Sequence, residues 1–234
     1  MHKLYQTILI LTGLLTIHSG ILAQESEERT FDDFQSLKIT GKIKAELIPG
    51  DENKIYIESD EFELKKVSTE IEKEVLTIKM LSKIFQKPTA YVRVTYKKIE
   101  SIEARADADI IFTEPIQQDT FKIESSSGAN IKLDIETNQL DIKNFQGGQT
   151  LIKGKTNLLK AYVNTGGILS ATDLNCDEVN IRLNTGGKAE MTVNQKITAK
   201  VNTMADLSYF GKPKEKEIST SLGGSVSAWD EEEQ

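Results

Sequence analysis

The sequence predicts an all-β protein built as a β-solenoid, in which the chain coils through stacked turns of β-strand. Three observations lead to this fold class. From residue 102 onward, short runs of alternating polar and apolar residues recur about every nineteen residues. Turns of small residues separate these runs, and no helical spacing of apolar residues interrupts them. A fixed repeat of this length without helices is typical of identical turns that stack and bury their apolar side chains against one another.

Each repeat is anchored by the second small residue of its turn. Successive anchors lie 18 to 21 residues apart, and they are Ala108, Ala129, Gly148, Gly167, Gly187, Ala205 and Gly224. At four of these turns the anchor is the second glycine of a pair, which predicts positive φ angles there, because glycine has no Cβ to clash. The Met204–Ala205 turn has no glycine, and we expect a tighter or kinked corner at that point.

Columns of apolar residues at fixed distances from the anchors predict the interior. Side chains two positions apart on a strand share a face, so the positions six before, two after and four after each anchor should all face inward. We expect successive members of a column to stack about 4.8 Å apart and to bury one another. The column six before the anchors consists of Ile102, Ile123, Ile142, Ala161, Ile181, Ala199 and Ile218.

The column five before the anchors faces outward and holds the candidate binding residues. Its basic stripe contains one aromatic side chain and consists of Lys143, Tyr162, Arg182 and Lys200. A stripe of this kind suits an anionic polymer such as a polysaccharide, and an ordinary solvated face is the alternative. Side-chain amides that stack from rung to rung can hydrogen-bond as a ladder. We therefore expect a structural role for the three asparagines at the corners, which are Asn164, Asn184 and Asn202.

The chain divides into four expected parts. Residues 1–23 read as a secretory signal peptide, because 4–17 is largely apolar and Ala23 ends a cleavage-site pattern. Residues 24–30 are expected to be a flexible leader. Residues 31–229 are expected to form one domain, with an irregular β-rich part at 31–100 that caps regular rungs at 101–229. We expect Trp229 to cover the last rung and 230–234 to be an acidic tail.

Composition and charge exclude several classes of function. Both histidines, His2 and His18, lie in the expected signal peptide. The rest of the chain therefore has no imidazole for a catalytic triad or a metal site. Cys176 is the only cysteine, so thiolate clusters are excluded, and we expect it to be a small buried residue. Removing Lys3 from the net charge of −7 leaves −8, which argues against a nucleic-acid partner.

Carboxylates are the remaining catalytic equipment. Asp107 and Asp109 flank one anchor, and Asp206 follows another at the matching turn. Paired carboxylates perform glycoside hydrolysis, so the alternative is a β-helix lyase or hydrolase acting on an anionic polysaccharide. Repeats as short as these leave little room for the loops of a catalytic cleft, and aspartate at a turn also has a structural use. We expect a non-enzymatic protein with no catalytic residues, metal site or cofactor.

Several segments resemble the head GIN domain family of Bacteroidetes, also called DUF2807, which is named for auto-transporter adhesins. The resemblance covers residues 31–229 and rests on FDDFQSLKITGKIKAELIPGD, YVRVTYKKIESIEARADADI, NTGG, LNTGG and YFGKPKEKEISTSLGGSV. It implies a right-handed, single-stranded parallel β-helix and adhesion, with no catalytic residues.

The sequence therefore predicts an exported, adhesin-like binding or scaffold module in the periplasm, at the cell surface or outside the cell. Its expected partner is a polysaccharide or an envelope protein, and it is not expected to be an integral membrane protein. A self-associating structural protein of the envelope is a further alternative.

Overall fold

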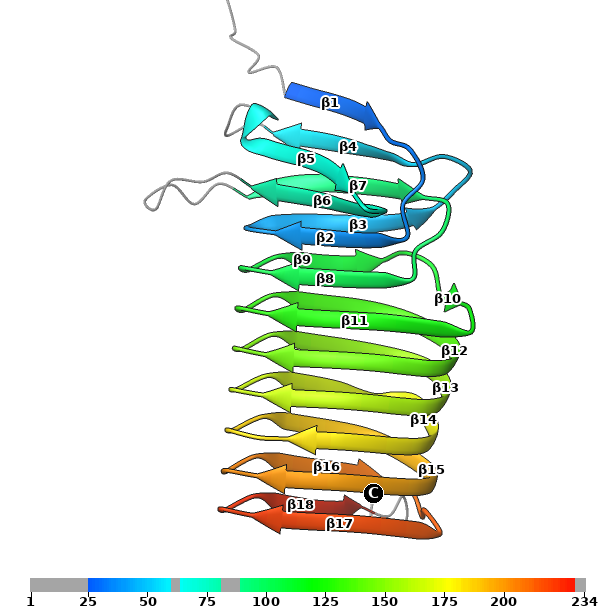
Figure 1. The fold of residues 1–234 in the computed structure, drawn as a ribbon, viewed down its shortest axis with the longest axis vertical. Helices are drawn as coiled ribbons and strands as arrows, with labels where there is room; N and C mark the ends of the chain where they lie inside the picture. The colour runs from blue at the N-terminus through cyan, green and yellow to red at the C-terminus, as the bar shows by residue number, and fades with distance from the viewer. Residues whose placement is uncertain (1–24, 60–63, 81–88, 230–234) are drawn as a thin grey trace, which may run out of the picture.

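The described chain is a right-handed coil of stacked β-strands around an apolar interior (Figure 1). The computed structural model describes residues 25–59, 64–80 and 89–229. In Figure 1, from β8 to β18, the near strands run to the left and the far strands to the right while the chain descends, which makes the coil right-handed. The solenoid with rungs of about nineteen residues is thus confirmed. The expected signal peptide and the acidic tail lie outside the described residues.

The coil is flattened, so that each rung contributes to two sheets, here called the front sheet and the back sheet after Figure 1. Four long strands bend and belong to both sheets: β12 (Asn130–Phe145), β13 (Gln149–Asn164), β14 (Ile168–Leu183) and β15 (Lys188–Asn202). The other front strands are β5 (Val67–Glu72), β6 (Val75–Met80), β2 (Ser36–Thr40), β8 (Ser101–Arg105), β11 (Thr120–Ser126) and β17 (Glu215–Ser221). The other back strands are β1 (Glu25–Thr30), β4 (Lys54–Ser59), β7 (Ala90–Tyr96), β3 (Ile43–Pro49), β9 (Asp109–Phe112), β16 (Asp206–Phe210) and β18 (Ser225–Trp229). Two short elements remain, η1 (Leu64–Lys66) and β10 (Ile116–Gln117).

The strand register reproduces the predicted columns. Parallel pairing joins the column six before the anchors in unbroken order from Ile102 to Ile218. Its members through Ala199 are buried, and Ile142 is only 1% exposed. Ile218 is 36% exposed, because no further rung covers it among the described residues. The inward assignment is therefore confirmed.

The seven corners share one backbone geometry. The two residues before each anchor have positive φ, as at Thr165 (47°) and Gly166 (69°). The N–H of the second residue donates to the carbonyl oxygen of the first residue of the next corner, as from Gly166 to Thr185 at 3.1 Å. The hydrogen-bond ladder thus continues around the corner. The expected kink at Met204–Ala205 is wrong, because Thr203 and Met204 have φ of 53° and 55°, like the other corners.

The anchor glycines do not have the positive φ angles that the sequence predicted for both members of each glycine pair. Only the first glycine of each pair has positive φ, and the anchor itself does not. A Cβ added to Gly148 would lie 2.1 Å from the carbonyl oxygen of Ser125 on the preceding rung. Close approach of two backbones therefore favours a very small residue at the anchor.

The one polar member of the inward columns has a buried partner. Thr150 donates its hydroxyl to the Asn144 side-chain carbonyl at 2.8 Å, and both residues are buried. Asn144 in turn donates its amide to the Ile168 carbonyl. These bonds satisfy polar groups whose burial would otherwise be costly.

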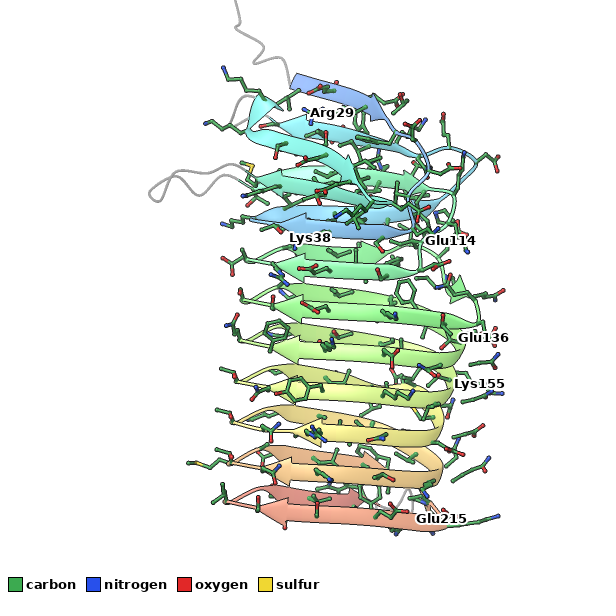
Figure 2. The ribbon with its side chains drawn as sticks, viewed as in Figure 1. Arg29, Lys38, Glu114, Glu136, Lys155 and Glu215 are labelled. Atoms are coloured by element: carbon green, nitrogen blue, oxygen red, sulfur yellow. The ribbon has the colours of Figure 1, made fainter. Side chains whose placement is uncertain are left out.

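The N-terminal end differs from the regular rungs. β1 pairs antiparallel with β4, β4 with β7, and β5 with β6. Arg29 of β1 donates to the Val67 carbonyl at 2.7 Å and to the Thr69 hydroxyl at 3.2 Å, which ties the back edge to the front edge (Figure 2). The expected flexible leader is wrong for residues 25–30, because backbone pairing with β4 orders them as β1.

The C-terminal end is more open. Every residue of β17 is exposed. Trp229 does not cover the last rung as expected, because it lies at an outward position beside Phe210 and is 49% exposed.

Candidate functional site

The front sheet carries a shallow groove of about 550 Å³ on its outer surface, here called the front groove. It crosses β8, β11 and the second halves of β12, β13 and β14. Alternate residues on each strand point outward, so two outward columns form its walls. One wall contains Lys122, Asp141, Lys160 and Asn180, and the other contains Glu103, Glu124, Lys143, Tyr162 and Arg182.

The predicted basic stripe lies along this groove. Direct strand pairing aligns Lys143, Tyr162, Arg182 and Lys200 on four successive rungs. The first three line the groove, and Lys200 continues the column one rung beyond it. Tyr162 is 36% exposed, and its hydroxyl oxygen accepts a hydrogen bond from the Asn164 amide at 3.0 Å. The structure thus brings all four predicted residues together.

The two glutamates at the N-terminal end of the front groove form ion pairs. Lys38 of β2, labelled in Figure 2, lies 2.9 Å from Glu103. Arg105 contacts both Glu103 and Glu124, the latter at 2.9 Å. These glutamates therefore belong to a salt-bridge ladder across three rungs.

Charges at the other end of the groove are unpaired. Within the described ranges, no carboxylate forms an ion pair with the three cations there, Lys143, Lys160 and Arg182, or with Lys200 on the next rung. Asp141, which lies between Lys122 and Lys160 in its column, accepts a hydrogen bond from Gln139 at 3.1 Å. Solvent-exposed cations without partners produce a local positive potential that can attract an anionic ligand.

The carboxylates of the enzymatic alternative lie elsewhere. Asp107 is a corner residue with φ of 63°, and Asp109 begins β9 of the back sheet. Asp206 begins β16, also in the back sheet, and accepts a hydrogen bond from Ser225. None of the three lines the front groove. In the part of the chain that the structure describes, no three His, Cys, Asp or Glu side chains are grouped to hold a metal ion.

The asparagine ladder at the corners is only partly as expected. Asn202 donates to the Asn184 side chain at 3.1 Å, which confirms rung-to-rung bonding for this pair. Asn164 donates to Tyr162 instead. A second ladder, absent from the sequence analysis, lies at the opposite bend, where Asn157 donates to Asn138 at 2.9 Å and Asn138 donates to Asp119. The nineteen-residue spacing of these three residues was the signal that could have revealed it.

Cys176 is buried in the rungs, as expected from its position. Burial raises the pKa of its thiol to about 12, and the neighbouring Asp177 carboxylate adds to the rise. The thiolate is therefore scarce at neutral pH, and the residue acts as a small apolar side chain.

Sequence reasoning missed a second groove of about 480 Å³ on the back sheet, here called the back groove. It lies on β3, β4, β7 and β9 and contains two tyrosines, Tyr56 and Tyr91. The signal was outward-facing aromatics in KIYIES and YVRVTY, two strands that lie outside the regular repeat.

Three solved bacterial structures share this fold. A Bacteroides fragilis protein described as a "putative adhesin" has a TM-score of 0.80 at 14% identity, covering 88% of this chain and 96% of that chain. A Parabacteroides distasonis "putative adhesin" has a TM-score of 0.72 at 18% identity, covering 88% and 97%. A "putative lipid binding protein" from the same species has a TM-score of 0.70 at 17% identity, covering 88% and 96%. At these identities the likeness shows the fold alone.

Three further findings bear on identity. No helix within the described residues is long and apolar enough to span a membrane. No functionally curated protein matches the chain. The family model described as "Putative auto-transporter adhesin, head GIN domain" matches residues 33–213, which is most of the chain. The chain therefore belongs to the head GIN domain (DUF2807) family.

Proposed function

We propose that the protein is an exported, non-enzymatic adhesin-like module of the cell envelope whose front groove binds an anionic polysaccharide. The observation that carries this proposal is the positive charge beside the exposed ring of Tyr162. Lys143, Arg182 and Lys200 are aligned in one outward column, and Lys160 lies in the neighbouring column. None of these four cations forms an ion pair within the described residues. The description of the family as adhesins and the apolar segment at 4–17 support attachment and export.

The spacing of the stripe suits a polymer. Neighbouring parallel strands lie about 4.8 Å apart, so the four stripe residues extend along the solenoid axis at a regular interval. Weak contacts that repeat along one chain add up, because each contact raises the effective concentration of the next. Tyr162 lies between two cations of the stripe and offers a flat apolar surface on which a sugar ring can stack.

The positions of the carboxylates favour binding over catalysis. A lyase or hydrolase that acts on the polymer in the front groove would need its carboxylates beside that polymer. Asp107 and Asp109 lie at a corner and on the back sheet, away from the stripe. Glu103 and Glu124 lie in the front groove but are held by Lys38 and Arg105.

The test is binding of polygalacturonate, measured by isothermal titration calorimetry on the purified mature chain, which is the chain without the expected signal peptide (residues 24–234). We expect Arg182→Glu and Lys143→Glu each to weaken binding about tenfold or more, because each replaces attraction by repulsion. The matched control is Lys188→Glu, which changes an exposed lysine on the back sheet and should alter affinity less than about twofold. Without residues 1–23 the chain has a net charge of −8, because Lys3 is lost from the −7 of the full sequence, and this charge disfavours nonspecific attraction to a polyanion. Absence of binding, or equal losses in all three variants, would contradict the proposal.

Self-association has one observation in its favour, which is the full exposure of β17 at the end of the solenoid. An exposed strand edge can pair with a second copy. Light scattering that shows only monomer across a wide concentration range would exclude this second candidate.

A further inference from the structure

The back groove is built from two outward columns on the N-terminal part of the back sheet. Pairing of β4, β7, β3 and β9 places Tyr56, Arg93, Glu46 and Ile111 in one column, which Lys132 continues. The same pairing places Glu58, Tyr91, Lys44 and Asp109 in the other. The two tyrosines therefore belong to opposite walls and to neighbouring strands.

The groove exposes two large apolar side chains. Tyr91 is 51% exposed and Ile111 is 41% exposed, whereas the outward positions of the regular rungs are mostly charged or polar. Large apolar side chains exposed around a concave surface mark ligand sites, because a free surface gains nothing from them. Their place around a groove makes Tyr91 and Ile111 candidates for contact with a ligand.

The back groove contains equal numbers of cations and carboxylates, and two of its cations contact tyrosine rings. The Lys44 ammonium lies 5.7 Å from the Tyr91 ring centroid, and the Arg93 guanidinium carbon lies 5.8 Å from that of Tyr56. Arg93 also lies 3.7 Å from a carboxylate oxygen of Glu46. The third cation of the groove is Lys132, and the groove also contains three carboxylates, those of Glu46, Glu58 and Asp109. The groove therefore offers both hydrogen-bond donors and acceptors without an excess of either charge.

We propose that the back groove binds a neutral oligosaccharide, with sugar rings stacked on Tyr56 and Tyr91. A sugar hydroxyl both donates and accepts hydrogen bonds, so it can use the carboxylates and the cations of the groove together. The apolar faces of the sugar rings match the exposed aromatic surface. This site is independent of the front groove, which lies on the opposite sheet.

Two other occupants fit the groove less well. A peptide that adds as a β-strand needs a free edge, but β3 is paired with both β7 and β9, and β7 with both β3 and β4. A lipid acyl chain would remove the six charged groups from water without offering them hydrogen bonds, which is costly.

The test uses the purified mature chain and a panel of neutral hexasaccharides, with glucose, mannose and xylose units, in isothermal titration calorimetry. We expect at least one hexasaccharide to bind, and Tyr91→Ala to weaken it about tenfold or more, with little change in thermal stability because Tyr91 is half exposed. Tyr91→Phe keeps the ring and should retain most of the affinity.

The matched control is Trp229→Ala, which removes an aromatic side chain of nearly equal exposure, 49%, from the other end of the back sheet. It should leave hexasaccharide binding within about twofold of the parent value. The proposal is overturned if no hexasaccharide binds, if Tyr91→Ala and Trp229→Ala have equal effects, or if an acidic hexasaccharide or a fatty acid binds this groove in preference.

Discussion

The front groove and the back groove lie on the same solenoid but differ in how the sequence builds them. The front groove lies on rungs that repeat every 18 to 21 residues, so each of its walls consists of residues at one fixed distance before the anchors. The back groove lies where β4 pairs antiparallel with β7, and where β7 and β9 both pair with the much earlier β3. A strict repeat therefore allows the residues of a surface groove to be predicted from their spacing in the sequence. Irregular strand pairing does not, because residues that share a groove then have no common spacing.

The two grooves also differ in the state of their cations. Lys143, Arg182 and Lys200 form no ion pair within the described ranges, whereas Lys44 and Arg93 lie over tyrosine rings. Cations without an ion-pair partner favour an anionic ligand, whereas cations that already contact tyrosine rings favour a neutral one.

Both grooves depend on the strict alternation of inward and outward residues along each strand. One pair of variants tests this alternation, and it has the largest expected effect on stability. Ile142→Asp places a carboxylate between buried aliphatic neighbours, and we expect it to cost several kcal/mol and to unfold the domain. Lys143→Asp, one residue further along the same strand, should change stability by about 0.5 kcal/mol or less. Urea unfolding followed by circular dichroism measures both. Equal stabilities would contradict the inward assignment.

A smaller effect tests the irregularity within the regular rungs. Gly154 has φ of 113°, and an added Cβ would lie 2.0 Å from the Ile135 carbonyl oxygen. We expect Gly154→Ala to cost about 3 kcal/mol, because strain and a backbone collision add. At Gly166 nothing lies within 4 Å of an added Cβ, so Gly166→Ala should cost only about 1 kcal/mol from its positive φ. The midpoints of urea unfolding rank the two, and the reverse ranking would show that close approach does not limit this strand.

The regular half of the fold could be predicted because its period is nearly constant. The anchors, the inward columns and the stripe from Lys143 to Lys200 follow from counting residues. The irregular half could not, because residues that touch there, such as Tyr56 and Arg93, share no spacing with other pairs. Nor could the expected kink at Met204 be corrected from sequence, because non-glycine residues also adopt positive φ at all seven corners.

Alkaline pH tests one buried group in each half of the molecule. Burial raises the pKa of Tyr96, in the irregular part, and of Cys176, in the regular rungs, to about 12. Both folded pKa values exceed the ordinary ones of 10.0 and 9.0, so each group contributes stability below its ordinary pKa. This contribution is lost as pH rises from about 9 to about 12.

We therefore expect the unfolding midpoint in urea to fall over that range. Cys176 should resist a thiol reagent at mildly alkaline pH until the chain unfolds. Rapid labelling of Cys176 in the folded state, or a constant midpoint, would contradict the burial of these groups.

The smallest expected effect is the difference between the two grooves in how their ligand affinity depends on salt. Added salt shortens the screening length from about 10 Å at 0.1 M to about 3 Å at 1 M. Affinity of the front groove for polygalacturonate should therefore fall several-fold over this range, while hexasaccharide affinity of the back groove should change less than about twofold. Equal salt dependence in calorimetry would remove the distinction between the grooves.

The most direct test of two independent grooves is titration of two variants, Arg182→Glu and Tyr91→Ala, with both ligands under one set of conditions. We predict that Arg182→Glu abolishes polygalacturonate binding and retains hexasaccharide binding, and that Tyr91→Ala has the opposite effect. If one folded variant binds neither ligand, or if each variant still binds both, the two grooves are not independent binding sites.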